Sequence, residues 1–372
     1  MATTLAPPES RVHPAASGAG AATPRRYVAL DAFRGFIMIC LVASGFGFAK
    51  LIDHSFWGVI ARQFDHVKWE GAVFWDLIQP SFMFMVGVAM PFSMARRAAE
   101  GASFAGNLMH VLKRCLILVF LSNLFTVVQR GAWEFGLINV LSQIAFTYLL
   151  CFLIMQLPFK GQIAACAGLL ALHWGLFVLF PGPEGPFSKE GNVGQAIDKW
   201  LLGRNYTGLY VTINFMSSTA TTLFGVWTAY LLRSGRSHRD VMKVLAMAAV
   251  ASLALGLALS PVIPVVKRIW TVSFTFYSTG LVLIMLMGFY WLVEMRGARR
   301  GIFPLLVVGS NSIFAYCVSQ MMGGNIRRTV GVFTGQFEWV GTLAPVALAC
   351  ASLGVIWYLC YWLHQRKVFI KV

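Results

Sequence analysis

The apolar residues of this chain come in long blocks, and this pattern limits the folds open to it. Each block runs for about twenty residues, the length of helix that crosses the hydrocarbon layer of a membrane. Hydrophobic residues make up 58% of the sequence and charged residues only 12%, too little charge to cover a water-soluble globule. Lipid offers the backbone no hydrogen-bond partner, so spanning segments form helices or closed barrels. The alternation that barrel strands need is absent, so the blocks predict an all-α transmembrane bundle.

We expect about ten spanning helices, within a range of about nine to eleven. Their predicted ranges are 27–49, 72–94, 112–130, 137–157, 162–180, 213–232, 242–262, 270–293, 303–321 and 341–363. The longest connections are 50–71, 181–212 and 322–340, and all three fall on one side of the membrane. These helices form a single domain over residues 26–372. Residues 1–25 are rich in Ala, Pro, Gly and Ser and predict a disordered cytoplasmic tail.

The Lys and Arg residues predict how the chain is oriented. They are dense in the short connections on one side of the membrane and sparse in the three long connections on the other. Because cytoplasmic loops carry an excess of Lys and Arg, this distribution favours cytoplasmic N- and C-termini. The expected location is the inner (cytoplasmic) membrane of a cell, with several passes. A net charge of +16 also occurs in nucleic-acid-binding proteins. Here the cations sit in short clusters between apolar blocks, so we expect no nucleic-acid partner.

Cysteine and histidine spacing gives no indication of a metal site. All seven cysteines lie within apolar blocks, and the sequence has no CxxC pair. Cysteines in such places usually act as small buried hydrophobic residues. We therefore expect neither a metal nor a disulfide framework.

Two charged residues lie near the start of the first predicted span. Asp31 and Arg34 are three residues apart, so they share one face of a helix and can pair. Charges within the bilayer are costly and are often functional. The pair is either a structural ion pair or a site where Arg34 binds an anionic group such as a phosphate.

A histidine precedes the second predicted span, in a run that also carries carboxylates. His66 follows Asp65 and lies ten residues before Asp76. A histidine beside a carboxylate can serve as a general base or as a nucleophile that carries an acyl group. Asp65 or Asp76 can orient the imidazole. His54, in the same connection, competes for this role, and the chemistry alone does not choose between them.

Polar residues recur at helical spacing in four of the predicted spans. Any one such face is often only an interhelical contact, but four in one chain predict a polar interior cavity. Their members are Asp76 and Gln79; Asn139, Ser142, Gln143 and Thr147; Asn214, Ser217, Ser218, Thr221 and Thr222; and Asn311, Ser312, Tyr316, Ser319 and Gln320. Tryptophans such as Trp69 are typical of the membrane interface, and aromatic rings can also stack on sugars.

At these positions the sequence resembles the catalytic membrane domain of the heparan-α-glucosaminide N-acetyltransferase family and its bacterial relatives. An Asp-x-Phe-Arg-Gly motif opens the first span at Asp31, Phe33, Arg34 and Gly35. A second motif matches His66, Trp69, Gly71, Asp76, Leu77, Pro80, Phe82, Phe84 and Gly87. Later matches include Ile263-Pro264-Val265, Trp270, Asn311-Ser312-Ile313 and the closing run Lys367-Val368-Phe369-Ile370-Lys371. The similarity covers residues 26–372 in order.

The resemblance implies a transmembrane acyltransferase that moves an acetyl group from cytoplasmic acetyl-CoA to an extracytoplasmic amino sugar or glycan. It maps the active-site histidine onto His66, and we assign Asp76 and Asp65 as the carboxylates that can orient its imidazole. We assign the acetyl-CoA contacts to Arg34, Asp31, Lys113, Arg114 and Asn311. We assign the acceptor contacts to Trp69, Ser44, Gln79 and Asn214. Where the family has an asparagine in the first span, this chain has Gly45.

Two other classes of function stay open at this stage. The same cavity would suit a transporter or flippase of a sugar or a lipid-linked glycan, although no internal repeat is visible. A membrane scaffold, or an enzyme of different chemistry on the same fold, is the third alternative. The sequence leaves open the identity of the acceptor, the length of the acyl chain and whether the chain forms a homodimer. It also does not decide whether the acetyl group passes directly to the acceptor or is first held on the enzyme.

Overall fold

The structure is a computed structural model that describes residues 27–206 and 210–370, and this part of the chain contains helices but no strand. The expected all-α fold is confirmed. The predicted tail at 1–25 lies outside the described residues. The α-helices are α1 (Val28–Val42), α2 (Gly58–Ala61), α3 (Ile78–Ala99), α4 (Phe104–Arg130), α5 (Val140–Ile154), α6 (Phe159–Leu179), α7 (Val193–Leu202), α8 (Phe215–Arg233), α9 (His238–Leu259), α10 (Val272–Tyr290), α11 (Phe303–Ser310), α12 (Ser312–Thr334) and α13 (Ala344–Gln365).

Six helical stretches in the described part of the chain are long and apolar enough to cross a membrane. They are Phe74–Ala99, Phe104–Arg130, Phe159–Leu179, His238–Leu259, Val272–Met295 and Ser312–Gln365, and the bent pair of α1 with Gly45–Leu51 would add a seventh. Each of the ten predicted ranges overlaps a helix. However, α5 has only 15 residues, and α8 carries a run of buried Ser and Thr side chains. The number of spans therefore stays a prediction, although a multi-pass membrane protein is supported.

Three of the predicted segments differ in shape from the structure, and each difference has a local cause. The predicted connection 322–340 is largely helical, because α12 continues until Gly335 takes a left-handed conformation with φ +56°. The predicted span 303–321 is interrupted at Asn311, where α11 gives way to α12. The first span bends by 41° where Ser44 takes a positive φ.

Helices α3 and α8 touch backbone to backbone at the centre of the bundle. A Cβ atom added to Gly87 of α3 would lie 1.9 Å from the carbonyl oxygen of Thr222 in α8. A Cβ atom added to Gly225 of α8 would lie 2.0 Å from the carbonyl oxygen of Phe84. Small residues allow this approach between membrane helices. The pair therefore forms a rigid centre from which the ends of the two helices are positioned.

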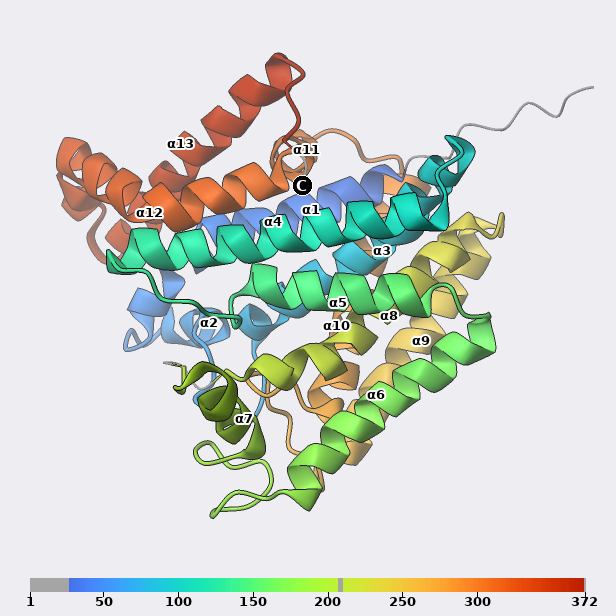
Figure 1. Cartoon of the computed structure of the whole chain (residues 1–372). Helices are drawn as coiled ribbons and strands as arrows, with labels where there is room; N and C mark the ends of the chain where they lie inside the picture. The colour runs from blue at the N-terminus through green and yellow to red at the C-terminus, as the bar shows by residue number, and fades with distance from the viewer. Residues whose placement is uncertain (1–26, 207–209, 371–372) are drawn as a thin grey trace, which may run out of the picture.

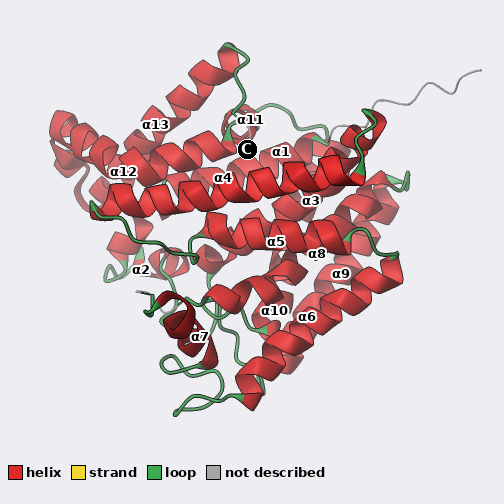
Figure 2. Cartoon of the chain, viewed as in Figure 1, coloured by secondary structure: helices red, strands yellow, loops and turns green. Residues whose placement is uncertain are grey.

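The connections between helices separate toward two ends of the molecule. The α3–α4 and α5–α6 connections lie at one end, and α2 and α7 lie at the opposite end (Figure 1). Loops surround α2 and α7 (Figure 2). A bundle whose helices cross one membrane requires this separation. The assignment of the first end to the cytoplasm remains a prediction from charge.

The glycine contact between α3 and α8 gives a test of the packing. We expect Gly87→Ala to lower the free energy of unfolding by about 1–3 kcal/mol, because the new methyl overlaps the α8 backbone. The control is Gly168→Ala in α6, where an added Cβ meets no atom within 4 Å. That change is expected to be neutral or to stabilise by up to about 1 kcal/mol. Thermal unfolding of the detergent-purified protein measures both, and equal effects would contradict the helix contact.

Candidate active site

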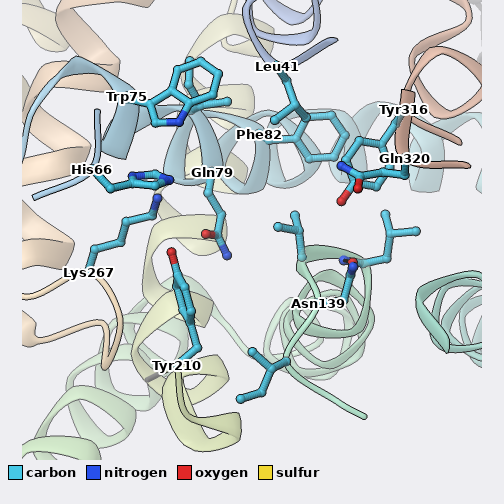
Figure 3. A pocket seen from close by; sticks show the side chains of 14 residues that line it. Leu41, His66, Trp75, Gln79, Phe82, Asn139, Tyr210, Lys267, Tyr316 and Gln320 are labelled. Carbon is cyan, nitrogen blue, oxygen red and sulfur yellow. Dashed lines mark hydrogen bonds between the residues drawn. The ribbon is translucent and has the colours of Figure 1, made fainter. Parts of the chain in front are cut away.

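A cavity of 310 Å³ lies at the end of the bundle where α3, α5 and α10 begin. Figure 3 shows His66 and Lys267 on one wall, with the Gln79 amide and the Tyr210 hydroxyl directed toward the same space. Polar and aromatic groups make up part of the lining: His66, Trp75, Gln79, Asn139, Tyr210, Lys267, Tyr316 and Gln320. Apolar residues complete it: Leu41, Ile78, Phe82, Ile138, Val140 and Leu141. The cavity thus has the mixed lining of a small-molecule site.

The His66 ring is held by a buried carboxylate at the start of the α3 span. Its Nδ1 atom lies 2.6 Å from Oδ1 of Asp76, a side chain that is only 2% exposed. The Val73 amide donates to the other carboxylate oxygen of Asp76 at 3.2 Å. An imidazole that donates from Nδ1 keeps its lone pair on Nε2. His66 is therefore oriented with Nε2 as its basic or nucleophilic atom.

A buried lysine is the third member of this cluster. The Nζ atom of Lys267 lies 3.4 Å from the same Oδ1 atom of Asp76, and Lys267 is only 5% exposed. A buried charge is costly unless it is paired. Asp76 and Lys267 compensate each other, while His66 shares the carboxylate. The three side chains form a His–Asp–Lys cluster on one wall of the cavity.

Backbone contacts fix the two loops that carry this cluster. The Gly71 amide, at φ +97°, donates to the carbonyl of Val265 at 2.8 Å and joins the His66 segment to the Lys267 segment. The Thr271 hydroxyl donates to the Pro264 carbonyl at 2.7 Å and accepts from the Val266 amide at 3.0 Å. One backbone hydrogen bond thus joins the two segments, and the Thr271 hydroxyl fixes the turn that carries Lys267.

A chain of side-chain hydrogen bonds supports the floor of the cavity. The Gln79 amide donates to Gln143 at 2.5 Å, and Gln143 donates to the Ser218 hydroxyl at 2.9 Å. This network connects α3, α5 and α8. Because its amide nitrogen is engaged with Gln143, Gln79 keeps its carbonyl oxygen for an acceptor role.

The segment just after Tyr210 is anchored by a buried carboxylate in α7. Both oxygens of Asp198 accept from the Thr212 amide, at 3.3 and 3.0 Å. Burial raises the pKa of the Asp198 carboxyl, and the hydrogen bonds from Thr212 oppose this rise. Asp198 thus fixes the chain two residues beyond the tyrosine that lines the cavity.

Several residues predicted for the site lie elsewhere. Asp65 is exposed, and Asp76 is the carboxylate that contacts His66. Trp69 does not line the cavity, because its indole donates to the Phe187 carbonyl at 3.0 Å and packs against an apolar cluster that includes Phe177. Asn214 is buried at the start of α8, and Ser44 lines a different cavity. Of the four predicted acceptor contacts, Gln79 alone lines the His66 cavity among the described residues.

The residues predicted to bind acetyl-CoA do not line this cavity. Arg34 lies 3.6 Å from Asp31, seven residues before Leu41 and so about 10 Å along α1 from the cavity. Lys113 is exposed, and the Arg114 guanidinium lies 4.4 Å from the centre of the Tyr148 ring. Asn311 is buried and holds the C-terminal segment, since it donates to the Val368 carbonyl and accepts from the Ile370 amide.

Gly45, the position where the resemblance led us to expect an asparagine, lies beside an aromatic ring. It has φ +63°, and a Cβ atom there would lie 3.1 Å from the Phe64 ring. Phe64 in turn packs against Trp75, whose ring centre lies 6.3 Å from that of His66. A side chain at position 45 would therefore meet the aromatic residues behind His66.

The sequence did not indicate Lys267 as a member of the site. It appeared as one of two cations in a short connection, with nothing to mark it as buried. No sequence pattern marked Tyr210 as a residue of the site either. Asn139, Tyr316 and Gln320 belong to the polar faces from which a cavity was predicted, and the structure places all three on its wall.

Comparison with known proteins adds to this geometry. The family model for the catalytic region of heparan-alpha-glucosaminide N-acetyltransferase matches residues 26–181, which include His66 and Asp76. The human heparan-alpha-glucosaminide N-acetyltransferase is 24% identical over an alignment 421 positions long, which covers 94% of this chain. The resemblance seen in the sequence is confirmed. The matched part is 60% of the human protein's length, and Lys267 lies beyond the residues that the family model matches.

The buried pair of Asp76 and Lys267 gives a stability test. We expect Asp76→Asn to destabilise the protein by about 3–5 kcal/mol, because the Lys267 charge is left buried without its counterion. Adding Lys267→Met should recover part of this loss, with a coupling energy above about 1 kcal/mol. Thermal unfolding of the two single variants and the double variant measures it. Additive effects of the two substitutions would contradict the pairing.

Proposed function

We propose that this chain is an integral-membrane acetyltransferase that moves an acetyl group from acetyl-CoA to the amine of an extracytoplasmic amino sugar or glycan. The observation that carries the proposal is the 2.6 Å contact between His66 and buried Asp76 on the wall of the cavity. A histidine oriented by a carboxylate is the arrangement that acyl transfer uses. The similarity to an N-acetyltransferase supports the same reaction class.

In this reaction Nε2 of His66 removes a proton from the acceptor. As the amine nitrogen attacks the acetyl carbonyl carbon, its proton passes to Nε2 and the carbon–sulfur bond breaks. The thiolate of CoA leaves and takes up the proton. Alternatively, Nε2 itself attacks the carbonyl carbon, CoA leaves, and the amine then displaces the acetyl group from the imidazole. Both routes consume one acetyl-CoA and release one CoA.

Asp76 and Lys267 have distinct tasks in this proposal. Asp76 holds the proton on Nδ1 and stabilises the imidazolium that forms when Nε2 accepts a proton. Lys267 lines the cavity beside His66, and its ammonium group is suited to stabilise the negative charge that develops on the acetyl oxygen. Because Asp76 and Lys267 are buried, the electrostatic effects of these two groups are stronger than they would be at an exposed surface.

The size of the cavity limits which part of each substrate it holds. A volume of 310 Å³ is near the lower end of the range for ligand sites, which begins at about 300 Å³. It suits an acetyl group with part of an acceptor ring, and Gln79 and Tyr210 are placed to bind the ring. The phosphates of CoA would lie outside it, and we assign them to the cations Arg34, Lys113 and Arg114. Cytoplasmic termini would bring the donor in from the Arg34 end of α1.

His66→Ala tests the catalytic role. We expect it to lower the rate of CoA release and of acetyl transfer by about 10²–10⁴-fold, because the group that takes the amine proton is removed. The control is His54→Ala, since the His54 ring accepts from the Phe56 and Trp57 amides and lies outside the cavity. The measurement uses purified protein, acetyl-CoA and a panel of amino sugars. Sugar uptake into proteoliposomes without acetyl-CoA, with no acetyl transfer, would favour the transporter alternative.

Mass spectrometry of the protein separates the two routes. If Nε2 is the nucleophile, incubation with acetyl-CoA alone adds one acetyl group to the peptide that contains His66, and the burst of CoA equals the enzyme concentration. If Nε2 is a base, no CoA is released until the amine is added. An acetyl group found instead on Lys267, with full activity of His66→Ala, would overturn the proposed roles.

A further inference from the structure

A second cavity lies between the end of α1, α12 and the first half of α13. Its volume is 220 Å³, and its lining includes Ser44, Ser319, Gly323, Arg327, Ala349 and Ser352. It shares no residue with the His66 cavity. Neighbouring residues of α1 and α12 line different cavities. Leu41 and Gln320 line the His66 cavity, whereas Val42 and Ser319 line the second one.

Arg327 gives this cavity its chemical character. The residue lies in the second half of α12. Its Nε and Nη2 atoms are buried, and neither has a hydrogen-bond partner among residues 27–206 and 210–370. No carboxylate in the described part of the chain forms an ion pair with it. Buried N–H groups of a guanidinium that lack an acceptor are unfavourable, so a ligand that supplies acceptor oxygens would stabilise this arrangement.

We propose that the Arg327 cavity binds a phosphate group, carried by an anionic lipid headgroup or present as free phosphate. The guanidinium presents a rigid fork of N–H donors that fits the oxygens of a phosphate. Ser44 and Ser319 line the same space, and a serine hydroxyl can donate to a further oxygen. Gly323 has no side chain to occupy it.

The surroundings of the cavity are suited to a lipid. Met322 on α12 is 53% exposed, and Val355 and Leu359 on α13 are 40% and 37% exposed. Such apolar surfaces on membrane helices face acyl chains, so a headgroup held at Arg327 would leave its chains beside them. Free phosphate would use the same donors but would gain nothing from these apolar side chains.

The test measures retention of phosphate-containing ligands by the purified full-length chain. Native mass spectrometry compares phosphatidylglycerol with phosphatidylcholine, and thermal shift measures binding of inorganic phosphate. We expect Arg327→Ala to lower phosphatidylglycerol retention by about tenfold or more, because the charge-assisted hydrogen bonds are lost. The control is Arg328→Ala, which removes an equal charge from an adjacent, exposed position and should retain the lipid.

A second variant keeps the test decisive if Arg327→Ala fails to fold. In Gly323→Val the new Cβ atom would lie 3.7 Å from Oγ of Ser319, an ordinary contact, so the helix should be kept while the cavity is partly filled. Lower retention in this variant supports the site. Phosphatidylglycerol binding alone identifies a lipid site, and phosphate stabilisation that depends on Arg327 identifies a soluble ligand. Equal binding by the Arg327→Ala and Arg328→Ala variants, or no binding to the unchanged protein, overturns the proposal.

Discussion

One carboxylate, that of Asp76, joins the parts of the chain that make the candidate active site. It accepts from the Val73 amide and contacts both the His66 ring and the Lys267 ammonium group. A buried acid with a single partner would tend to stay protonated, whereas three hydrogen-bonding groups favour its charged form. The position of His66 therefore depends on a lysine that lies 191 residues from Asp76 in the sequence. Loss of either charge would affect the fold as well as the chemistry.

The apolar bundle provides the rigid frame that such a cluster needs. The contact of Gly87 and Gly225 brings α3 and α8 together, and the chain of Gln79, Gln143 and Ser218 links them to α5 near the cavity. Close-packed protein interiors deform little. The packing of these helices therefore sets the width of the cavity between His66 and the wall opposite it. The two loops that complete the site are then fixed by the contact between Gly71 and Val265.

Much of the fold could be predicted because membrane helices depend on a simple property of the sequence, the length of apolar blocks. The pairing of His66 with a nearby carboxylate was also predictable, although the choice of Asp76 over Asp65 needed the structure. Long-range contacts were not. Nothing local marks Lys267 as buried, and the bend at Ser44 turns that residue toward the second cavity. Residues 322–334 belong to the predicted connection 322–340, yet they continue α12.

The contact that Asn311 makes with the C-terminal segment also sets an order for assembly. Its side chain closes the break between α11 and α12 by binding the backbone of Val368 and Ile370. Because Ile370 is made 59 residues after Asn311, ribosomal synthesis must deliver both α12 and α13 to the membrane before this contact can form. The break between α11 and α12 thus stays open during translation and closes as a late step of biogenesis.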